Sequence, residues 1–174
     1  MNNAIQNNKP LVEVTAIQMQ DAKVLQKLVN EIWNDYYPDI IGADQVAYML
    51  GSFYNLNAIE KNIIDPHFHY YFVRFKAQIV GYIGIKHYAD QPLFWSQFYI
   101  HPKWGGKGLG LQVFNRVLDY YKPNTIRLTV NRFNIKAINF YFKLGFKIRE
   151  VANFDIGAGY VMEDFVMEWQ ARHI

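Results

Sequence analysis

Hydrophobic and polar positions follow two different periods in the first third of the chain. Residues 11–17 alternate as a strand does, and residues 21–37 then carry hydrophobic side chains at helical spacing. Asp21 stands where we expect a helix cap. Residues 43–64 continue the helical spacing with an interruption near their middle, which indicates one or two further short helices. The pattern predicts an opening strand followed by two or three helices.

The spacing changes to that of strands in the middle of the chain. Residues 68–75 and 78–88 predict two strands joined by a short turn near Lys76, and residues 92–100 predict a third strand. Beyond a glycine-rich segment the helical spacing appears again. One face of that helix is formed by Leu109, Val113, Phe114, Val117, Leu118 and Tyr121.

The last part of the chain predicts three strands and one helix. Residues 125–130 read as a buried strand, and residues 136–144 read as a short helix that Gly145 closes. Residues 146–152 and 159–169 predict two strands that pair with each other through a short connection. This order of elements predicts an α/β fold.

The composition is that of one domain. At 174 residues and 51% hydrophobic content the chain is long enough for one core, so we expect residues 1–174 to form a single domain. There is no cysteine, which excludes a disulfide framework, a cysteine zinc site and a thiol nucleophile. The N-terminus lacks a signal-peptide pattern, and no apolar run approaches the roughly 20 residues of a membrane span. We therefore expect a cytoplasmic protein without a membrane partner.

The charges indicate no nucleic-acid partner. Eighteen Lys and Arg residues against fifteen Asp and Glu residues give a net charge of +3, and the basic residues are scattered along the chain. Nucleic-acid binding usually requires a clustered basic face. The aromatic content of 17% is high, and we expect most of it to form the core and some of it to line a groove.

The segment WGGKGLG, residues 104–110, places four glycines between a predicted strand and a predicted helix. The dinucleotide pattern G-x-G-x-x-G fails here, because its last glycine would fall on Leu111 or Val113. The nucleoside-triphosphate loop also fails, because Lys107 is followed by Gly108 and not by Ser or Thr.

Two interpretations of this segment remain. It is either a tight turn or a loop whose backbone amides face an anion at the start of a helix, where the helix dipole favours negative charge. Glycine lets the main chain approach phosphate oxygens closely. The number of glycines, with Lys107 among them, favours a pyrophosphate-binding loop.

A second motif, NRFNIKAINFYFKLGF at residues 131–146, follows at a short distance. Together with YIHPKWGGKGLG it resembles the GNAT family of N-acetyltransferases. That family's acetyl-CoA loop reads Arg/Gln-x-x-Gly-x-Gly/Ala, and its next helix reads Asn-x-x-Ala-x-x-x-Tyr ahead of Gly-Phe. The resemblance implies a single domain with a mixed, mostly antiparallel twisted sheet of about seven strands, splayed at the cofactor site and flanked by helices. Residues 48–59 and 155–169 resemble a bacterial branch that includes polyamine N-acetyltransferases.

The resemblance also implies roles for individual residues. Loop amides would hold the CoA pyrophosphate, the main chain near Phe98 and Ile100 would pair with the pantetheine arm, and Tyr141 would be the catalytic proton donor beside the sulfur. Asn134, Ala137 and Tyr141 share one helix face by their spacing, although Asn134 fits a helix cap equally well. The implied cofactor-binding residues are Phe98, Ile100, Gly105, Gly106, Lys107, Gly108, Leu109, Gly110 and Asn134.

The chain departs from the family pattern at two places. Gly105 stands where the loop usually carries Arg or Gln, and Lys103 or Lys107 would have to compensate. Ser96 and Gln97 stand where many relatives carry a carboxylate base, so the base is unassigned. The amine proton has a route through water to one of three candidates, which are Glu31, Asp35 and His87.

Two further groups of polar residues stand outside these assignments. His67 and His69 share a strand face, but with no third ligand in view we expect no metal site. Asp155, Glu163 and Asp164 either form an acidic strand edge or attract a cationic substrate, and the edge is favoured.

The expected function is acetyl-CoA-dependent acetylation of a primary amine, either a polyamine or another small amine. The alternatives are a non-catalytic CoA-binding module and a nucleotide-binding regulatory domain. We expect a monomer or a homodimer.

Overall fold

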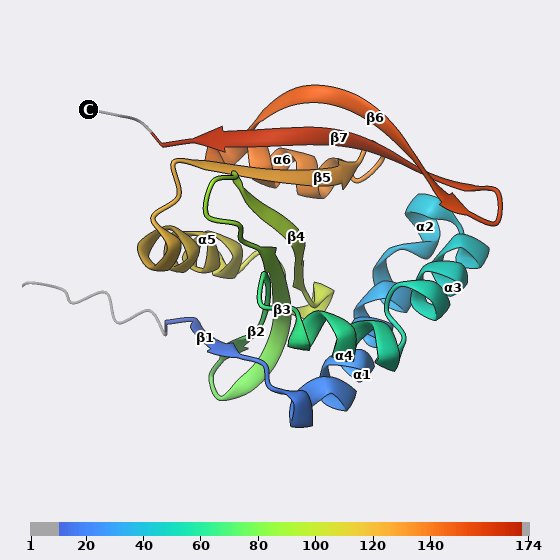
Figure 1. The fold of residues 1–174 in the computed structure, drawn as a ribbon, viewed down its shortest axis with the longest axis horizontal. Helices are drawn as coiled ribbons and strands as arrows, with labels where there is room; N and C mark the ends of the chain where they lie inside the picture. Colours follow the sequence, from blue (N-terminus) through green and yellow to red (C-terminus); the bar gives the residue numbers. More distant parts are fainter. Residues whose placement is uncertain (1–10, 172–174) are drawn as a thin grey trace, which may run out of the picture.

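One seven-stranded sheet organises the computed structural model, which describes residues 11–171 (Figure 1). The strand order is β1-β2-β3-β4-β5-β7-β6, and every neighbouring pair is antiparallel except the parallel pair β4 and β5. This confirms the predicted fold class. The strands are β1 (Glu13–Ala16), β2 (Phe68–Phe75), β3 (Gln78–Lys86), β4 (Leu93–Ile100), β5 (Thr125–Asn131), β6 (Lys147–Gly157) and β7 (Tyr160–Gln170).

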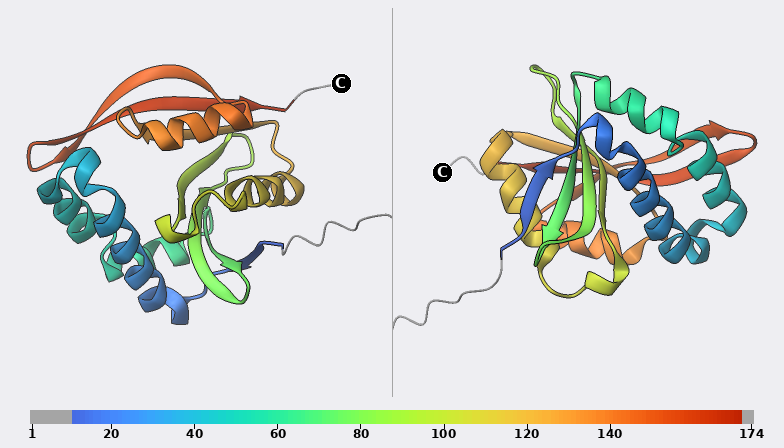
Figure 2. Two further views of the ribbon diagram at one scale, coloured as in Figure 1. Left: turned by 180° about the vertical axis from the view of Figure 1, so that it is seen from behind. Right: turned by 90° about the horizontal axis from the view of Figure 1, so that it is seen from below.

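Helices α1 to α4 lie on one side of the sheet and α5 lies on the other (Figure 2). The helices are α1 (Ala22–Tyr36), α2 (Pro38–Ile41), α3 (Ala43–Ser52), α4 (Leu56–Ile64), α5 (Leu109–Tyr121) and α6 (Ile135–Leu144). The short α2 was not predicted, because Pro38 gives no hydrophobic period but suits the first turn of a helix. None of the helices between residues 11 and 171 is long and apolar enough to cross a membrane.

The start of α1 differs from the expectation in one detail. Asp21 precedes α1 as predicted, but its side chain makes no capping hydrogen bond to that helix. Its carboxylate instead accepts a hydrogen bond from the Gln18 amide at 2.9 Å. The prediction that Asp21 caps α1 was therefore right about the position and wrong about the contact.

The two long hairpins turn through residues with positive φ. Lys76 and Ala77 have φ values of 50° and 61°, which confirms the predicted turn between β2 and β3. Ala158 and Gly159 form the corresponding turn between β6 and β7, with φ values of 53° and 79°. Two-residue hairpin turns of this kind need positive φ at both central positions. Because this second turn is so tight, β6 continues to Gly157, beyond the predicted end of the strand.

Two hydrophobic cores lie on the two faces of the sheet. The first joins α5 and α6 to the sheet and contains Val113, Phe114, Ile138 and Tyr141. The second joins α1, α3 and α4 to the sheet and is rich in tyrosine; its members include Leu25, Ile32, Trp33, Tyr37, Tyr54, Ile59, Tyr70 and Tyr82. Each core fixes one set of helices, so side chains of α1 and α6 are held at opposite faces of the same strands.

The sheet opens between β4 and β5. These strands pair only where Leu93 lies beside Ile126 and Phe94 beside Arg127. Beyond that point β4 pairs with β3 alone, as far as Ile100, and an irregularity in the register near Ser96 bends the strand. Backbone groups of β4 and β5 therefore face a gap in the sheet, where a ligand can take the place of a neighbouring strand.

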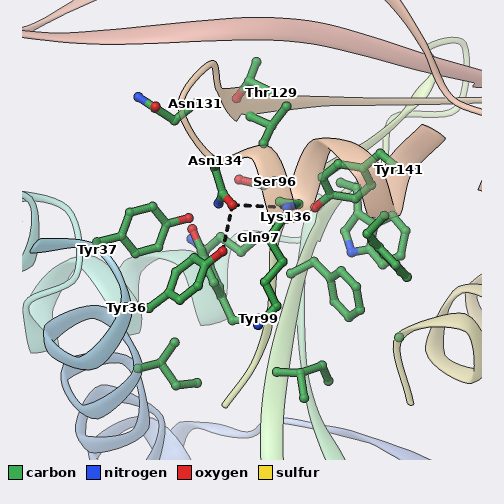
Figure 3. A pocket seen from close by; sticks show the side chains of 18 of the residues that line it. Tyr36, Tyr37, Ser96, Gln97, Tyr99, Thr129, Asn131, Asn134, Lys136 and Tyr141 are labelled. Atoms are coloured by element: carbon green, nitrogen blue, oxygen red, sulfur yellow. Dashed lines mark hydrogen bonds between the residues drawn. The ribbon is translucent and has the colours of Figure 1, made fainter. Parts of the chain in front are cut away.

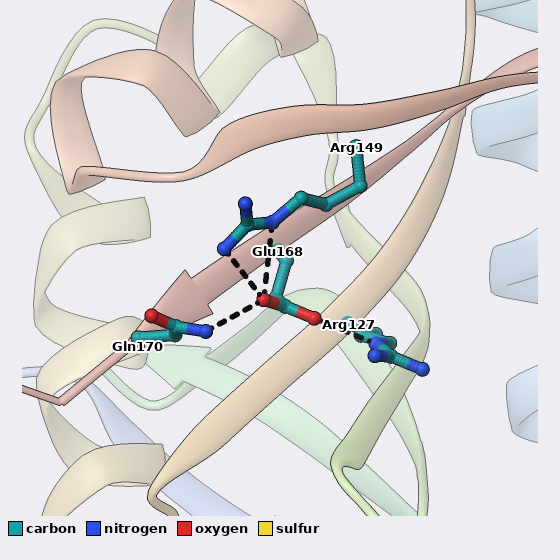
Figure 4. A network of polar contacts seen from close by, with 4 residues as sticks. All are labelled: Arg127, Arg149, Glu168 and Gln170. Atoms are coloured by element: carbon teal, nitrogen blue, oxygen red, sulfur yellow. Dashed lines mark hydrogen bonds and ion pairs between the residues drawn. The ribbon is translucent and has the colours of Figure 1, made fainter.

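A polar network ties together the closed end of this opening (Figure 4). The buried carboxylate of Glu168 in β7 accepts hydrogen bonds from Arg127 Nε at 2.8 Å, from Arg149 Nη2 at 2.9 Å and from Gln170 Nε2 at 2.9 Å. The hydrogen bond from Arg127, together with the hydrogen bond from Arg149 and the charges of both arginines, lowers the pKa of Glu168 against the opposing effect of burial. Because Arg127 is in β5 and Arg149 is in β6, one carboxylate links three adjacent strands.

Candidate active site

A cavity of about 910 Å³ lies at the gap between β4 and β5 (Figure 3). Its lining extends from the glycine-rich segment, past β4, β5 and α6, to the aromatic side chains of α1. Asn134 and Tyr141 project into it from α6, opposite Tyr36 and Tyr37 (Figure 3). The cavity therefore joins the two regions that the sequence marked as candidates for chemistry.

The glycine-rich segment forms a tight loop between β4 and α5. A single turn of 3-10 helix, η2 (Pro102–Trp104), ends where the Gly105 amide donates a hydrogen bond to the Pro102 carbonyl oxygen at 2.9 Å. Gly106 and Gly108 both have a φ of +74°, a left-handed conformation that glycine adopts without steric cost. Gly108 is the N-cap residue directly before α5.

Several consecutive backbone amides of this loop have no acceptor. The first helical hydrogen bond of α5 runs from the Gln112 amide to the Gly108 carbonyl oxygen at 3.3 Å, so the preceding amides of the helix lack a helical partner. Within residues 11–171, the amides of residues 106–108 donate to no backbone acceptor either. The amides open to an anion are those of residues 106–111. The amide of Gly105, which was expected to be among them, already donates to the Pro102 carbonyl oxygen.

Gly110 is required for a different reason. A Cβ at this position would lie 2.9 Å from two ring carbons of Phe140, so glycine lets α5 and α6 approach each other. The two helices enclose the cavity from one side. A substitution at Gly110 would therefore disturb helix packing as well as any ligand at the loop.

Two lysines lie beside the loop. Lys107 Nζ is 4.5 Å from the centre of the Trp104 ring, a cation-π distance. Lys136 reaches the loop from α6, because a Cβ on Gly105 would lie 3.7 Å from its Nζ. Lys136 was not among the residues predicted for the site. Its position two residues after Asn134 in the α6 motif could have indicated that it lies near the loop.

Asn134 holds the start of α6. Its Oδ1 accepts one hydrogen bond from the Ala137 amide at 3.1 Å and another from the Tyr36 hydroxyl at 2.8 Å. The cap that the sequence allowed is thus confirmed, and the same atom connects α6 to α1 across the cavity. The contact of Asn134 with a cofactor stays a prediction.

Tyr141 lies on the same face of α6 as Asn134 and Ala137, and all three line the cavity as their spacing predicted. The ring is 92% buried and packs against Phe140 and Phe146. Burial raises the pKa of the Tyr141 phenol well above its usual value, and the nearby Tyr37 and Tyr36 raise it further. The phenol therefore stays protonated at neutral pH and can act as a hydrogen-bond or proton donor.

Aromatic rings of α1 and the neighbouring segments form the wall opposite α6. Trp33 stacks on Tyr37 with ring centroids 4.4 Å apart, and its ring lies 4.7 Å from that of Tyr54. Tyr99 of β4 lies 6.0 Å from Tyr37. Burial raises the pKa of Tyr37 to about 12 and raises that of Tyr99 well above its usual value. At neutral pH this wall is uncharged and rich in π faces.

The position of Asp164 differs from the one predicted from the sequence. It was expected on an acidic strand edge, but β7 lies between β5 and β6, and the Asp164 side chain is 97% buried at the cavity. Its Oδ1 has no hydrogen-bond partner among the described residues. Burial raises the pKa of Asp164 to about 6, against the opposing effects of the Thr129 hydroxyl and the Arg132 charge.

Of the other polar candidates, the proposed proton acceptors lie away from the cavity. Glu31, Asp35 and His87, the three proposed proton acceptors, are exposed and do not line it. Ser96 and Gln97 do line it. Gln97 is buried, and its Nε2 donates a hydrogen bond to the Tyr70 hydroxyl at 3.3 Å.

The remaining acidic and histidine residues also take other positions. Glu163 is paired with Arg132 at 2.7 Å, and the Asp155 carboxylate accepts a hydrogen bond from the Gly157 amide at 2.8 Å. His67 stacks on Tyr88 at 4.4 Å. Within residues 11–171, His67 and His69 belong to no group of three potential metal ligands.

Known proteins resemble this chain in sequence and in fold. A family model described as the acetyltransferase (GNAT) family matches residues 26–146. The N-alpha-acetyltransferase RimI of Mycobacterium tuberculosis is 28% identical over 93 residues, which span 52% of this chain and 59% of RimI.

Two solved structures share the fold. The PaiA N-acetyltransferase of Thermoplasma acidophilum, solved in complex with coenzyme A, has a TM-score of 0.75 at 20% identity over 92% of this chain and 99% of its own. A variant of the spermidine N-acetyltransferase SpeG of Vibrio cholerae has a TM-score of 0.64 at 19% identity, over 91% of this chain and 93% of its own.

Replacing Asp164 with Asn should change how stability depends on pH. The Asp164 carboxyl group binds its proton more tightly in the folded protein than in the unfolded chain, where the pKa of Asp is about 4. The wild type therefore loses stability as the pH rises from about 4 to about 6. Asn has no charge to bury. The free energy of unfolding of Asp164→Asn, relative to wild type, should therefore increase by about 2–3 kcal/mol between pH 4 and pH 7. Urea unfolding at both pH values measures this, and a difference independent of pH would contradict it.

Proposed function

The chain belongs to the acetyltransferase (GNAT) family, and from this we propose that it transfers the acetyl group of acetyl-CoA to a primary amine, either a polyamine or another small amine. The observation that carries the proposal is the run of unpaired amides at the start of α5, which opens into the same cavity as Tyr141. The names of RimI and SpeG describe acetylation of amino groups, one of them in spermidine. They support an amine acceptor here.

The loop fits the pyrophosphate of acetyl-CoA. Unpaired amides and the positive end of the α5 dipole favour a dianionic group, and the left-handed glycines leave the backbone open to phosphate oxygens. Lys136 and Lys107 add positive charge on two sides of the loop. Lys136 thus provides the side-chain donor that Gly105 cannot provide.

Different groups of the cavity would serve different parts of the acetyl transfer. Acetyl-CoA supplies an activated acetyl group, and the open edge of β4 near Phe98 and Ile100 offers backbone groups to its pantetheine arm. Tyr141 keeps its proton at neutral pH and donates it toward the departing sulfur. A free backbone amide of β4 near Phe98 stabilises negative charge on the carbonyl oxygen.

One observation favours a second candidate function. Ser96 and Gln97 carry no carboxylate into the cavity, so a non-catalytic CoA-binding module is the alternative. Such a module would use the same loop and cavity but would not turn over acetyl-CoA.

The wild-type protein should separate these two functions. Titration calorimetry should show binding of acetyl-CoA with an affinity in the micromolar range, and addition of small primary amines should release CoA thiol in proportion to acetylated amine. Binding of acetyl-CoA with no amine-dependent thiol release would support the non-catalytic module. Binding of NAD or ATP in preference to CoA would contradict both.

Gly108→Asp should weaken CoA binding without unfolding the protein. Asp is a favourable residue at a helix start and tolerates left-handed backbone, but its carboxylate would lie beside the pyrophosphate. We expect CoA affinity to fall at least about tenfold by calorimetry. Gly108→Asn is the uncharged control and should bind CoA more tightly than the Asp variant. Acetyl-pantetheine, which lacks the pyrophosphate, should bind both variants equally, and equal CoA binding by both would exclude an anion at this loop.

Tyr141→Phe should lower turnover and leave acetyl-CoA affinity unchanged. The ring keeps its packing, while the proton donor needed as charge develops on sulfur is lost. We expect kcat to fall about 10–100-fold in an assay where chemistry limits the rate. Tyr120→Phe, at an exposed ring outside the cavity, is the matched control. Wild-type turnover by Tyr141→Phe would reduce Tyr141 to a packing residue.

A further inference from the structure

The cavity contains one buried carboxylate that forms no ion pair with any basic residue between residues 11 and 171. Asp164 is the single acidic residue among the lining residues, and its side chain is 97% buried with Oδ1 unpartnered. Burying a carboxylate without a partner is costly, and proteins normally pair such a group with a cation. An unpaired carboxylate inside a ligand cavity therefore marks a place for a positive charge on the ligand.

The basic side chains nearest Asp164 make their contacts with other residues, although Arg132 Nε is buried without a partner among the described residues. Arg132 donates hydrogen bonds to Glu163 at 2.7 Å and to Asn153 at 3.0 Å. Lys136 lies against the Tyr36 ring and beside the glycine loop. No ion pair joins Asp164 to any basic residue in the part of the chain that the structure describes.

The surfaces near Asp164 also suit a cation. Burial raises the pKa of Tyr37 and of Tyr54, and the Asp164 charge adds a smaller effect in the same direction; all three residues line the same cavity. The rings of Tyr37, Tyr54 and Trp33 line the cavity, and aromatic rings attract an ammonium group and pack against the methylene groups attached to it. Asn131, opposite Asp164 in the neighbouring strand, and Thr129 add polar groups at the same wall.

We propose that Asp164 is the acceptor-binding carboxylate and that it binds a protonated amino group of a cationic acceptor such as a diamine. This inference rests on the proposed acetylation of an amine. The carboxylate rejects acceptors that carry a negative charge at the same place, because two buried anions repel each other. This gives Asp164 the role of a specificity-determining residue. Glu163, the preceding residue of the same strand, does not share this role because it is already paired with Arg132.

Two acceptors of equal length and opposite end charge test the proposal. The wild type should acetylate 1,4-diaminobutane with a much larger kcat/KM than 4-aminobutanoate. Asp164→Asn should lower kcat/KM for 1,4-diaminobutane about 30-fold or more, chiefly by raising KM. The ratio of kcat/KM for 1,4-diaminobutane to that for 4-aminobutanoate should therefore be smaller in this variant than in the wild type. Glu163→Gln removes the same charge one residue away and should change kcat/KM less than about threefold. CoA affinity, measured by calorimetry, should be unchanged in both variants.

The outcomes separate this inference from the proposed function. If the wild type binds CoA and acetylates amines but Asp164→Asn keeps wild-type kcat/KM, the role of Asp164 is wrong and the acetyltransferase stands. If the wild type neither binds CoA nor acetylates any amine, the proposed function itself fails. If the wild type binds CoA but no cationic amine, Asp164 is not an ammonium receptor.

A structure provides a second measurement that does not depend on the variant folding. In a crystal of wild-type protein with CoA and 1,4-diaminobutane, an amine nitrogen should lie about 2.7–3.2 Å from an Asp164 carboxylate oxygen. Both nitrogens placed away from Asp164 would overturn the proposal.

Discussion

The separation of β4 from β5 is the constraint on which the rest of the structure depends. Because these strands pair at only two positions, the sheet is continuous at one end and open at the other. The closed end is held by the hydrogen bonds of Glu168, and the open end leaves backbone groups of β4 facing a cavity. A parallel pair without full hydrogen bonding is stable here because both strands are buried in the same core, which contains Leu93 and Trp95 of β4 with Ile126 and Leu128 of β5.

The opening also explains why residues from remote segments meet. Side chains of α1 and α6 belong to different cores on opposite faces of the sheet, and they come into contact only where no sheet separates them. The hydrogen bond from the Tyr36 hydroxyl to Asn134 Oδ1 is formed there. Asn134 thus caps α6 and at the same time fixes the distance between the aromatic wall and the helix that carries Tyr141.

The sequence predicted the parts of the site that rest on local patterns. The glycine loop, the face shared by Asn134 and Tyr141, and the turn at Lys76 all follow from spacing within a short segment, and the structure has them where they were expected. The short connection between the last two strands was predicted, but the end of β6 was placed too early, because an alanine with positive φ leaves no signal in a sequence. Lys136 and Asp164 were missed or misjudged because their roles depend on which strands and helices become neighbours.

Asp164 illustrates this limit in physical terms. In sequence, Glu163 and Asp164 are adjacent carboxylates on one strand, and nothing distinguishes them. Strand alternation sends them to opposite faces, where one finds Arg132 and the other finds a cavity lined by aromatic rings. The first face stabilises a charge, and the second raises the pKa of Asp164 by burial. A chain that retains such a carboxylate accepts a less stable folded state, and a ligand that carries a positive charge restores the lost stability only while it is bound.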